Sequence, residues 1–424
     1  MFRGITTSPI LKDDGTIQAA SGYDPGSGLW CHNIPEIDIP ETPTQDEAIQ
    51  ALAFIRSTFR TFPFADGKRM KDPELGVDVI ADKYARVDES SFLVGLMTAV
   101  CRQSLELAPG FLCNAPSGSG AGTGKGLLVK SMCIAGSGAK PAAFTSGHDS
   151  EEFDKRLTAA FIEARPAVFL DNFNAKELKS DILASVLTEN PAMVRVMGQT
   201  KNVPLHTRTF VAITGNGVVI SEDMVRRLIL CNLNANMPDP EQRKFAPGFL
   251  QRIYDTRRVI LKSCLTIRRW GRQNKMPDCG VAMGSYEQWC QWCRDPLLGL
   301  GCNDPFVRVD EIKAADPMRR QLSDVFETWW EKHGDVSLKA KELSADVLEL
   351  IDQKSSRGFD GKLNYNQNWV SGWLQRHNGK SHGEYQLLLL WAIPGRGTVP
   401  PGRRLLPSAL ILALARPWFQ PMCK

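Results

Sequence analysis

A glycine-rich run in the chain reads Gly118-Ser119-Gly120-Ala121-Gly122-Thr123-Gly124-Lys125-Gly126. The apolar residues 111–113 before it predict a short strand, and residues 127–132 after it predict a helix. At such a strand–loop–helix junction, bare backbone N–H groups surround phosphate oxygens and the helix N-terminus adds positive potential. We therefore predict that residues 118–126 bind the phosphates of ATP, with Lys125 reaching the β- and γ-phosphates. The alternative is a flexible glycine–serine loop.

This run departs from the phosphate-loop pattern G-x-x-x-x-G-K-[ST] at two positions. Ser119 stands where the pattern has its first glycine, and Gly126 stands where it has a serine or threonine. The hydroxyl of that serine or threonine normally binds magnesium. Mg²⁺ would therefore depend on an acidic residue elsewhere and on water.

An acidic residue follows the next apolar strand. Residues 167–170 are apolar, and Asp171 comes directly after them, 46 positions beyond Lys125. A carboxylate at the carboxyl end of a parallel strand beside a phosphate loop can hold Mg²⁺. Asn172 stands where a glutamate usually activates water, so it would position water without accepting a proton. The alternative for Asp171 is an ordinary exposed residue at a strand end.

A further strand, residues 210–214, leads to Asn216, whose carboxamide would contact the γ-phosphate and align the attacking water. The alternative is a simple turn, because Asn216-Gly217 is a common turn dipeptide. Arg226 and Arg227 follow 10 and 11 residues later. An arginine from a neighbouring subunit can stabilise the charge of phosphoryl transfer, and we favour Arg227 over Arg226 for this role. Two solvated charges before an edge strand are the alternative.

Strands alternate with helices between residues 106 and 235, which predicts an α/β fold with a parallel sheet. The expected parts of the chain are an N-terminal arm and helical region (1–105), this core (106–235), a second helical region (236–334), a winged-helix DNA-binding domain (335–384) and a divergent, poorly ordered tail (385–424). Trp369 and Trp373 lie four residues apart on an expected helix, a spacing more typical of a core than of a base-stacking surface.

In this order, Lys125, Asp171-Asn172, Thr214-Gly215-Asn216 and Arg226-Arg227 resemble the motifs of superfamily 3 helicases of the AAA+ class. More narrowly, the chain from about residue 5 to about residue 384 is similar to the C-terminal helicase part of primase–helicases encoded by bacterial mobile elements and phages. Further segments that carry the resemblance are Gly22-Tyr23-Asp24, Ala115-Pro116, Phe169-Leu170, Leu265-Thr266-Ile267-Arg268, Asp316-Pro317 and Trp369 to Leu374.

The resemblance implies an AAA+ phosphate-loop core in a homo-oligomeric ring, such as a hexamer. Such a ring uses ATP and Mg²⁺ at subunit interfaces to move on single-stranded DNA during replication of a mobile element or phage. In such proteins a hairpin enters the ring channel. It lies between the acid strand, here residues 167–170 before Asp171, and the sensor strand, here residues 210–214 before Asn216. Here Arg195 and Lys201 lie in that span and would contact DNA phosphates, a surface hairpin being the alternative. Because the chain has no recognisable primase-like acidic cluster, we expect a separate primase or a truncated copy of a primase–helicase.

The composition indicates a folded multidomain protein. Of 424 residues, 43% are hydrophobic and 23% are charged, which excludes a disordered or collagen-like chain. The net charge of +4 is too small to indicate a nucleic-acid partner by itself. The eleven cysteines are scattered, and no apolar stretch reaches the ~18–20 residues of a membrane span. We therefore expect reduced thiols, a cytoplasmic location and no membrane contact.

Two local clusters allow more than one interpretation. Residues 241–275 contain ten Lys or Arg against two acids, which would contact a DNA backbone or form a solvated helix face. The four cysteines Cys279, Cys290, Cys293 and Cys302 could form a zinc site. Only Cys290 and Cys293 are closely spaced, so free core thiols are favoured.

Two further functions stay open beside an ATP-driven DNA helicase. The departures at Gly126 and Asn172 suit a nucleotide-binding regulator that no longer hydrolyses ATP. A non-catalytic DNA-binding remnant would instead use the basic stretch and the winged helix.

Overall fold

The computed structural model describes residues 4–12, 15–117, 120–144, 150–174, 177–178, 180–195, 202–237, 239–242, 248–276, 279, 283–315, 317–358, 362–382, 384–391 and 410–415. The chain divides into two compact units, residues 1–310 and 311–424. Each unit has its own hydrophobic core.

The described helices are α1 (Gln45–Phe59), α2 (Val87–Cys101), α3 (Lys125–Ser137), α4 (Ser150–Ile162), α5 (Asp181–Thr188), α6 (Glu222–Val225), α7 (Phe249–Gln273), α8 (Glu287–Trp289), α9 (Asp295–Gly299), α10 (Phe306–Ala315), α11 (Pro317–His333), α12 (Ala345–Ile351) and α13 (Gln367–His377). The larger strands are β8 (Gly110–Ala115), β10 (Ala167–Leu170), β12 (Ala192–Arg195), β13 (Asn202–Leu205), β14 (Phe210–Asn216), β16 (Leu228–Asn232), β21 (Tyr385–Trp391) and β22 (Leu410–Ala415). Short strands include β1 (Gly4–Thr6), β4 (Gly22–Asp24), β5 (Leu29–Cys31), β9 (Ala143–Phe144), β17 (Leu338–Lys339), β18 (Ser356–Arg357), β19 (Leu363–Asn364) and β20 (Ser381–His382).

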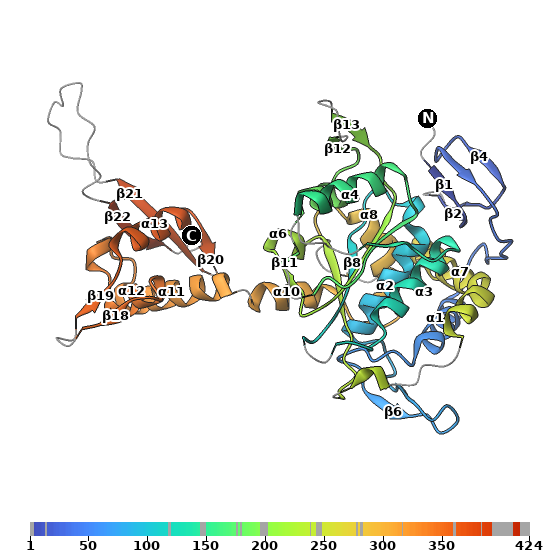
Figure 1. Ribbon diagram of the computed structural model, residues 1–424, viewed down its shortest axis with the longest axis horizontal. Coiled ribbons are helices and arrows are strands. Elements are labelled where there is room, and N and C mark those ends of the chain that lie inside the picture. The colour runs from blue at the N-terminus through green and yellow to red at the C-terminus, as the bar shows by residue number, and fades with distance from the viewer. Residues whose placement is uncertain are drawn as a thin grey trace, which may run out of the picture. The chain divides into compact units, whose positions relative to one another are not determined.

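The centre of the first unit is a parallel sheet in the order β16-β8-β14-β10-β9 (Figure 1). Its strands are apolar at consecutive positions rather than at alternate ones, and nearly every residue is buried. That pattern is expected when both faces of a parallel sheet are covered. The predicted α/β fold with a parallel sheet is confirmed.

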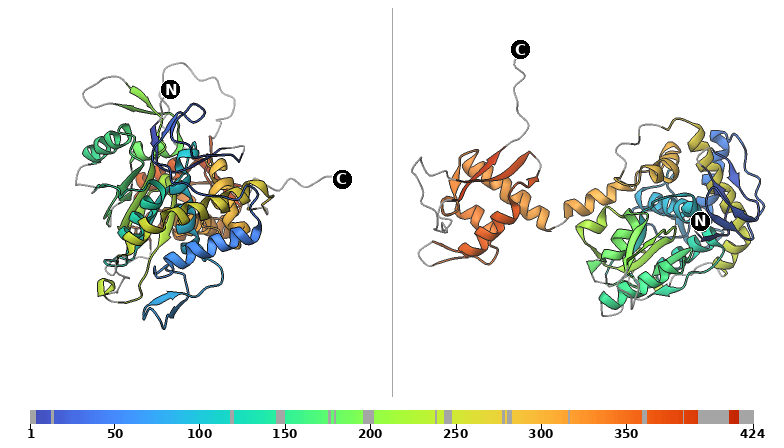
Figure 2. Two further views of the ribbon diagram at one scale, coloured as in Figure 1. Left: turned by 90° about the vertical axis from the view of Figure 1, so that its right-hand side faces the viewer. Right: turned by 90° about the horizontal axis from the view of Figure 1, so that it is seen from above.

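One face of this sheet packs against α2 and α3, and α7 packs against α3 within the same core (Figures 1 and 2). Because side chains alternate along a strand, every second residue, such as Phe111, Phe169 and Ala212, joins this core. The residues between them, such as Leu112, Val168 and Ile213, are buried as well. The order of strands brings β8, β14 and β10 side by side, so their carboxyl ends meet at one edge.

The predicted basic stretch lies mainly on α7, and four of its arginines contact the protein itself. Arg257 donates to the carbonyls of Ile134 and Thr7, at 3.1 and 2.9 Å. Arg258 bonds the carbonyl of Glu36, and Arg269 bonds those of Gly15, Ile39 and Pro40. Arg268 is fully buried, with its guanidinium 3.5 Å from the ring centre of Trp292. These four arginines therefore hold the N-terminal arm and the core, and among them Arg258 stays exposed. Contact of the basic stretch with DNA stays a prediction.

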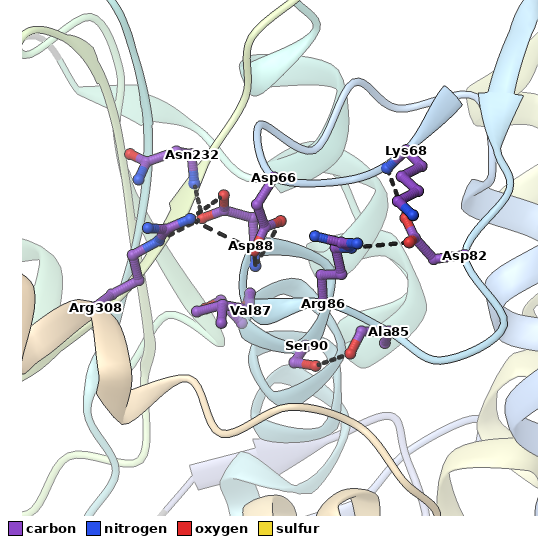
Figure 3. A network of polar contacts seen from close by, with 11 residues as sticks. Asp66, Lys68, Asp82, Ala85, Arg86, Val87, Asp88, Ser90, Asn232 and Arg308 are labelled. Atoms are coloured by element: carbon purple, nitrogen blue, oxygen red, sulfur yellow. Dashed lines mark hydrogen bonds and ion pairs between the residues drawn. The ribbon is translucent and has the colours of Figure 1, made fainter. Parts of the chain in front are cut away.

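A buried ion pair fixes the start of α10 to the first unit (Figure 3). Asp88 on α2 is fully buried and accepts from Arg308 on α10, with Nη2 and Oδ2 2.7 Å apart. Asp88 also accepts from the backbone N–H of Asn232 at 2.9 Å, and Asp66 lies 3.5 Å from Arg308. Burial raises the pKa of Asp88, while Arg308 opposes that rise. The network joins α2, α10 and the end of β16.

The cysteines of the described residues are free thiols. Cys290, Cys293 and Cys302 are buried and Cys279 is partly exposed. Within the described ranges, no group of three or more His, Cys, Asp or Glu could hold a metal ion. None of the helices described here combines the length and apolar character that a membrane crossing requires.

The second unit contains helices around a small antiparallel sheet. Its helices and strands follow the order α11, β17, α12, β18, β19, α13, β20, β21 and β22, and the sheet order is β17-β22-β21-β20. The core includes Phe326 and Trp329 of α11, Val347 of α12, and Trp373 and Leu374 of α13. That this unit is a winged helix stays a prediction. Whether this unit binds DNA stays a prediction.

The second unit differs from the expected boundaries at both ends. Helix α11, placed by the sequence in a central helical region, packs into the core of this unit. Residues 385–391 and 410–415, expected in a poorly ordered tail, pair with each other as β21 and β22. Strand β22 also pairs with β17, where Leu338 lies opposite Leu412. These strands complete the sheet with partners far away in the sequence. Residues 392–409 and 416–424 lie outside the described residues.

Candidate functional site

The glycine-rich loop connects β8 to α3, as the sequence predicts. Helix α3 begins at Lys125, directly after Gly124, whose φ is +97°. Gly122 has a φ of +75°. A side chain at Gly122 would collide with the backbone of Glu241, and one at Gly120 would collide with Asn216. Glycine is therefore required here both for backbone conformation and for close approach. Gly118 and Ser119 lie outside the described residues.

Lys125 points into the space between the loop and the ends of the strands. Its Nζ donates to Oδ1 of Asn216 at 2.7 Å and to Oγ1 of Thr123 at 3.2 Å, and it also bonds the carbonyl of Gly120. Thr123 in turn donates to the carbonyl of Gly120 at 2.9 Å, which fixes the loop. Burial lowers the pKa of Lys125, and the charge of Asp171 partly opposes this. The ammonium is thus partly desolvated and held next to the sensor strand.

Asp171 lies at the end of β10 and is held by the neighbouring strand. Thr214 on β14 donates from Oγ1 to Oδ1 of Asp171 at 2.6 Å. The backbone N–H of Asn172 donates to the same Thr214 oxygen at 3.2 Å. One hydroxyl therefore orients the carboxylate and fixes the turn after it. The sequence did not single out a role for Thr214, because a threonine in an apolar strand is typical of strand composition alone.

Asn172 and Asn216 are connected through Asn174. The side chain of Asn174 donates to Oδ1 of Asn172 at 2.5 Å and accepts from the backbone N–H of Asn216 at 2.9 Å. Asn172 has a φ of +63°, a left-handed conformation that asparagine adopts more readily than most residues. This geometry turns the chain sharply after Asp171. The turn brings the Asn172 carboxamide to the same cleft as Asp171.

These groups line one cleft of about 410 Å³ at the carboxyl edge of the sheet. Its lining residues are Ala121, Gly122, Gly124, Lys125, Gly126, Leu127, Asp171, Asn172, Thr214 and Asn216. The structure therefore brings together the loop, the acid and the sensor asparagine that the sequence identified separately. A polar cleft at this edge, opposite a helix N-terminus, has the chemistry that binds phosphate groups.

Neither candidate arginine is among the residues that line this cleft, and the two differ in exposure. Arg227 has a side chain only 12% exposed; it donates to the carbonyl of Asp223 at 2.7 Å and also pairs with the Asp223 carboxylate. Its own carbonyl accepts from Gly110 at the start of β8, at 2.9 Å. Arg226 bonds Asp223 at 2.9 Å, but its side chain is 63% exposed. The two arginines lower the pKa of Asp223. Of the two, Arg226 is the one presented to solvent.

No protein-family model matches the chain, and no curated protein matches its sequence. Solved structures that match include apo forms of the C-terminal region of NrS-1. An A-form structure shares 11% identity, covers 78% of this chain and 81% of the other, and has a TM-score of 0.36. A second apo structure shares 13% identity over 73% of this chain and 77% of the other, with a TM-score of 0.34. At these values the likeness assigns no function to the chain.

A hairpin lies between the acid strand and the sensor strand, as the resemblance implies. Strands β12 and β13 pair antiparallel, with Arg195 opposite Asn202, and they project from the first unit (Figure 1). Arg195 is exposed at the end of β12. Lys201 and residues 196–200 lie outside the described residues. Contact of this hairpin with DNA stays a prediction.

Proposed function

We propose that the chain is an AAA+ type ATPase that binds ATP with Mg²⁺ at the carboxyl edge of the five-stranded sheet and hydrolyses it. The observation that carries this proposal is the convergence of Lys125, Asp171 and Asn216 on one cleft beside the glycine loop. The three groups come from different elements, 46 and 45 residues apart in sequence. An ammonium, a carboxylate and a carboxamide around a helix N-terminus match the needs of a triphosphate and its metal ion.

Lys125 would neutralise the β- and γ-phosphates. In the structure its ammonium bonds three oxygens: the Asn216 carboxamide oxygen, the Thr123 hydroxyl and the Gly120 carbonyl. Phosphate oxygens would replace some of these neutral acceptors with charged ones, which form stronger hydrogen bonds. Because burial disfavours the charged lysine, a bound phosphate would also relieve part of that cost.

Asp171 would hold the Mg²⁺ ion that accompanies ATP. Mg²⁺ commonly keeps several waters and takes one or two carboxylates together with phosphate oxygens. The cleft fits this mode, since Asp171 is oriented by Thr214 at 2.6 Å and Gly126 supplies no side-chain ligand. The bound ion would supply charge neutralisation for phosphoryl transfer.

Asn216 and Asn172 would orient the attacking water. Both are carboxamides, which donate and accept hydrogen bonds but do not take a proton at neutral pH. Asp171 is the only carboxylate among the residues that line the described cleft. We therefore expect turnover that depends on positioning rather than on a strong general base.

Further parts of the proposal rest on the resemblance to superfamily 3 helicases. We propose that copies of this chain form a ring, that ATP sites lie between subunits, and that single-stranded DNA passes along the β12/β13 hairpin. The exposed Arg226 and the projecting hairpin support this assignment. A role in replicating a mobile element or phage, with priming supplied by a separate protein, belongs to the same proposal.

ATP turnover measured with and without single-stranded DNA tests the function. We expect Mg²⁺-dependent release of phosphate that single-stranded DNA stimulates several-fold. Tight ATP binding without phosphate release, in the presence of both DNA and Mg²⁺, would instead identify the nucleotide-binding regulator. That second function is favoured by one observation, the lack of a hydroxyl at Gly126 beside Asp171.

Gly126→Ser should increase the apparent affinity for Mg²⁺ in ATP turnover by about fivefold, which is about 1 kcal/mol. A Cβ at position 126 would have only Oδ1 of Asp171 within contact range, at 4.0 Å, so a serine fits and its hydroxyl faces the proposed ion. Gly126→Ala is the matched control, because both substitutions stabilise α3 by about 0.5–1 kcal/mol but only serine adds an oxygen. The same Mg²⁺ dependence in both variants would contradict an ion placed between position 126 and Asp171.

A further inference from the structure

A second cleft lies within the second unit. It has a volume of about 630 Å³ and is bordered by the end of α12, strands β18 and β19, and the start of α13. Figure 1 shows β18 and β19 beside α12. Its lining is rich in groups that both donate and accept hydrogen bonds, including Gln321, Gln353, Asn364, Asn366 and Tyr365. Trp369 supplies a large aromatic surface.

Trp369 is exposed but fixed in orientation. Its side chain is 49% exposed, whereas Trp373, one turn later on α13, is 3% exposed and belongs to the core. The indole N–H of Trp369 donates to the carbonyl of Ile351 at 3.1 Å. The guanidinium of Arg376 lies 5.2 Å from the Trp369 ring centre. The sequence prediction that both tryptophans belong to a core therefore holds only for Trp373.

The polar groups at the start of α13 are held in place by the backbone. Asn366 caps the helix, with its side chain accepting from the N–H groups of Asn368 and Trp369 at 3.0 and 3.1 Å. Asp352 is buried and accepts from the backbone N–H of Asn366 at 2.8 Å and of Lys354 at 3.2 Å. These bonds fix the walls of the cleft without a ligand. A site whose groups are already positioned pays less entropy on binding.

The charged, amide and aromatic groups that line this cleft indicate which class of ligand it binds. Its single carboxylate, Asp352, already bonds two backbone N–H groups, which disfavours a metal ion. One lysine, Lys354, lines the cleft, which is too little charge for an isolated phosphate cluster. Amides and an aromatic ring instead match a flat molecule that stacks on one face and hydrogen-bonds at its edge, as a nucleobase does.

We propose that this cleft binds one unstacked base of a single-stranded nucleic acid, with the base against Trp369, its edge on the carboxamides and a neighbouring phosphate near Lys354. A base inside a duplex is stacked on both sides and cannot enter such a cleft. The site is independent of the ATP cleft, because all its residues lie in the second unit. The protein would then bind single-stranded nucleic acid in the absence of ATP.

The test is binding of the full-length protein to a fluorescent dT oligomer without nucleotide. Trp369→Ala should weaken binding by roughly 5- to 100-fold, since base–aromatic stacking contributes about 1–3 kcal/mol per base. Trp369→Phe should retain most of the affinity. Trp30→Ala is the matched control, because Trp30 on β5 is 46% exposed but lies in the first unit. ATP turnover without DNA should be equal in all three variants.

Two further measurements separate base binding from general charge attraction. An oligomer with abasic positions should bind as weakly to the normal protein as the intact oligomer binds to Trp369→Ala. Lys354→Gln should reduce the slope of log K against log salt by about 0.7, the value for one phosphate contact with a single strand, whereas Trp369→Ala should leave that slope unchanged. Stronger binding of intact dT or rU than of the abasic oligomer supports the proposal and shows which polymer is preferred. Equal binding of intact and abasic oligomers, or an affinity unchanged in Trp369→Ala, overturns it.

Discussion

Replacing Lys125 with alanine should reduce ATP turnover by roughly 10²- to 10³-fold or more, the cost of removing one preorganised charge-stabilising donor. The Lys125 ammonium is the one cation among the residues that line the proposed ATP cleft. Its loss would leave the charge of the β- and γ-phosphates to the backbone N–H groups and to Mg²⁺. ATP binding should weaken as well, because the ground state and the transition state both carry that charge. Steady-state phosphate release and a nucleotide-binding titration measure the two effects separately.

The control for this variant is Lys130→Ala. Lys130 lies on the same helix, but at five residues from Lys125 it projects in a different direction and does not line the cleft. It should turn over ATP at the normal rate. Equal turnover in the Lys125→Ala protein and the unchanged protein would show that the glycine loop is not a phosphate site, and the ATPase proposal would then fail. Binding of a dT oligomer at the Trp369 cleft would survive that result.

The ATP cleft could be predicted from the sequence because parallel strands end at a common edge. Once the loop that carries Lys125, together with Asp171 and Asn216, is placed at the carboxyl ends of apolar strands, their approach follows from the fold class alone. The sequence did not predict Thr214 as the partner of Asp171, because that contact depends on the register between β14 and β10. The sequence also could not show which of Arg226 and Arg227 is exposed, because that depends on how the short helix α6 ends.

Long-range contacts account for most of the other differences. Arginines of α7 bind carbonyls up to 254 residues earlier in the chain, so their charge alone could not show that they hold the N-terminal arm. Residues 410–415 were expected to be poorly ordered because their composition is unlike the rest of the chain. They form β22 because β17 and β21 provide partners on both sides. In both cases the contact partner is distant in sequence, so no local sequence pattern predicts the contact.

Arg226→Ala should lower the rate of ATP hydrolysis by about 10³-fold with little change in ATP binding, the effect expected of an arginine that acts only in the transition state. The sequence favoured Arg227, and both arginines bond Asp223, but the side chain of Arg227 is only 12% exposed whereas that of Arg226 is 63% exposed. An arginine that must reach a neighbouring subunit needs a solvent-exposed side chain. Arg227→Ala should instead lower the melting temperature, because it removes the bonds of a largely buried guanidinium to the carbonyl and carboxylate of Asp223, which hold the end of α6.

Mixing two inactive proteins tests whether Arg226 acts between subunits. In the proposed ring, each site takes Lys125 from one copy and Arg226 from the next, so the interface is heterologous. When Lys125→Ala and Arg226→Ala proteins assemble together at equal amounts, about a quarter of the interfaces would contain both native residues. ATP turnover should therefore reappear in the mixture although neither protein is active alone. A mixture that stays inactive while both proteins co-assemble would contradict a shared site, and recovery with Arg227→Ala in place of Arg226→Ala would reassign the role to Arg227.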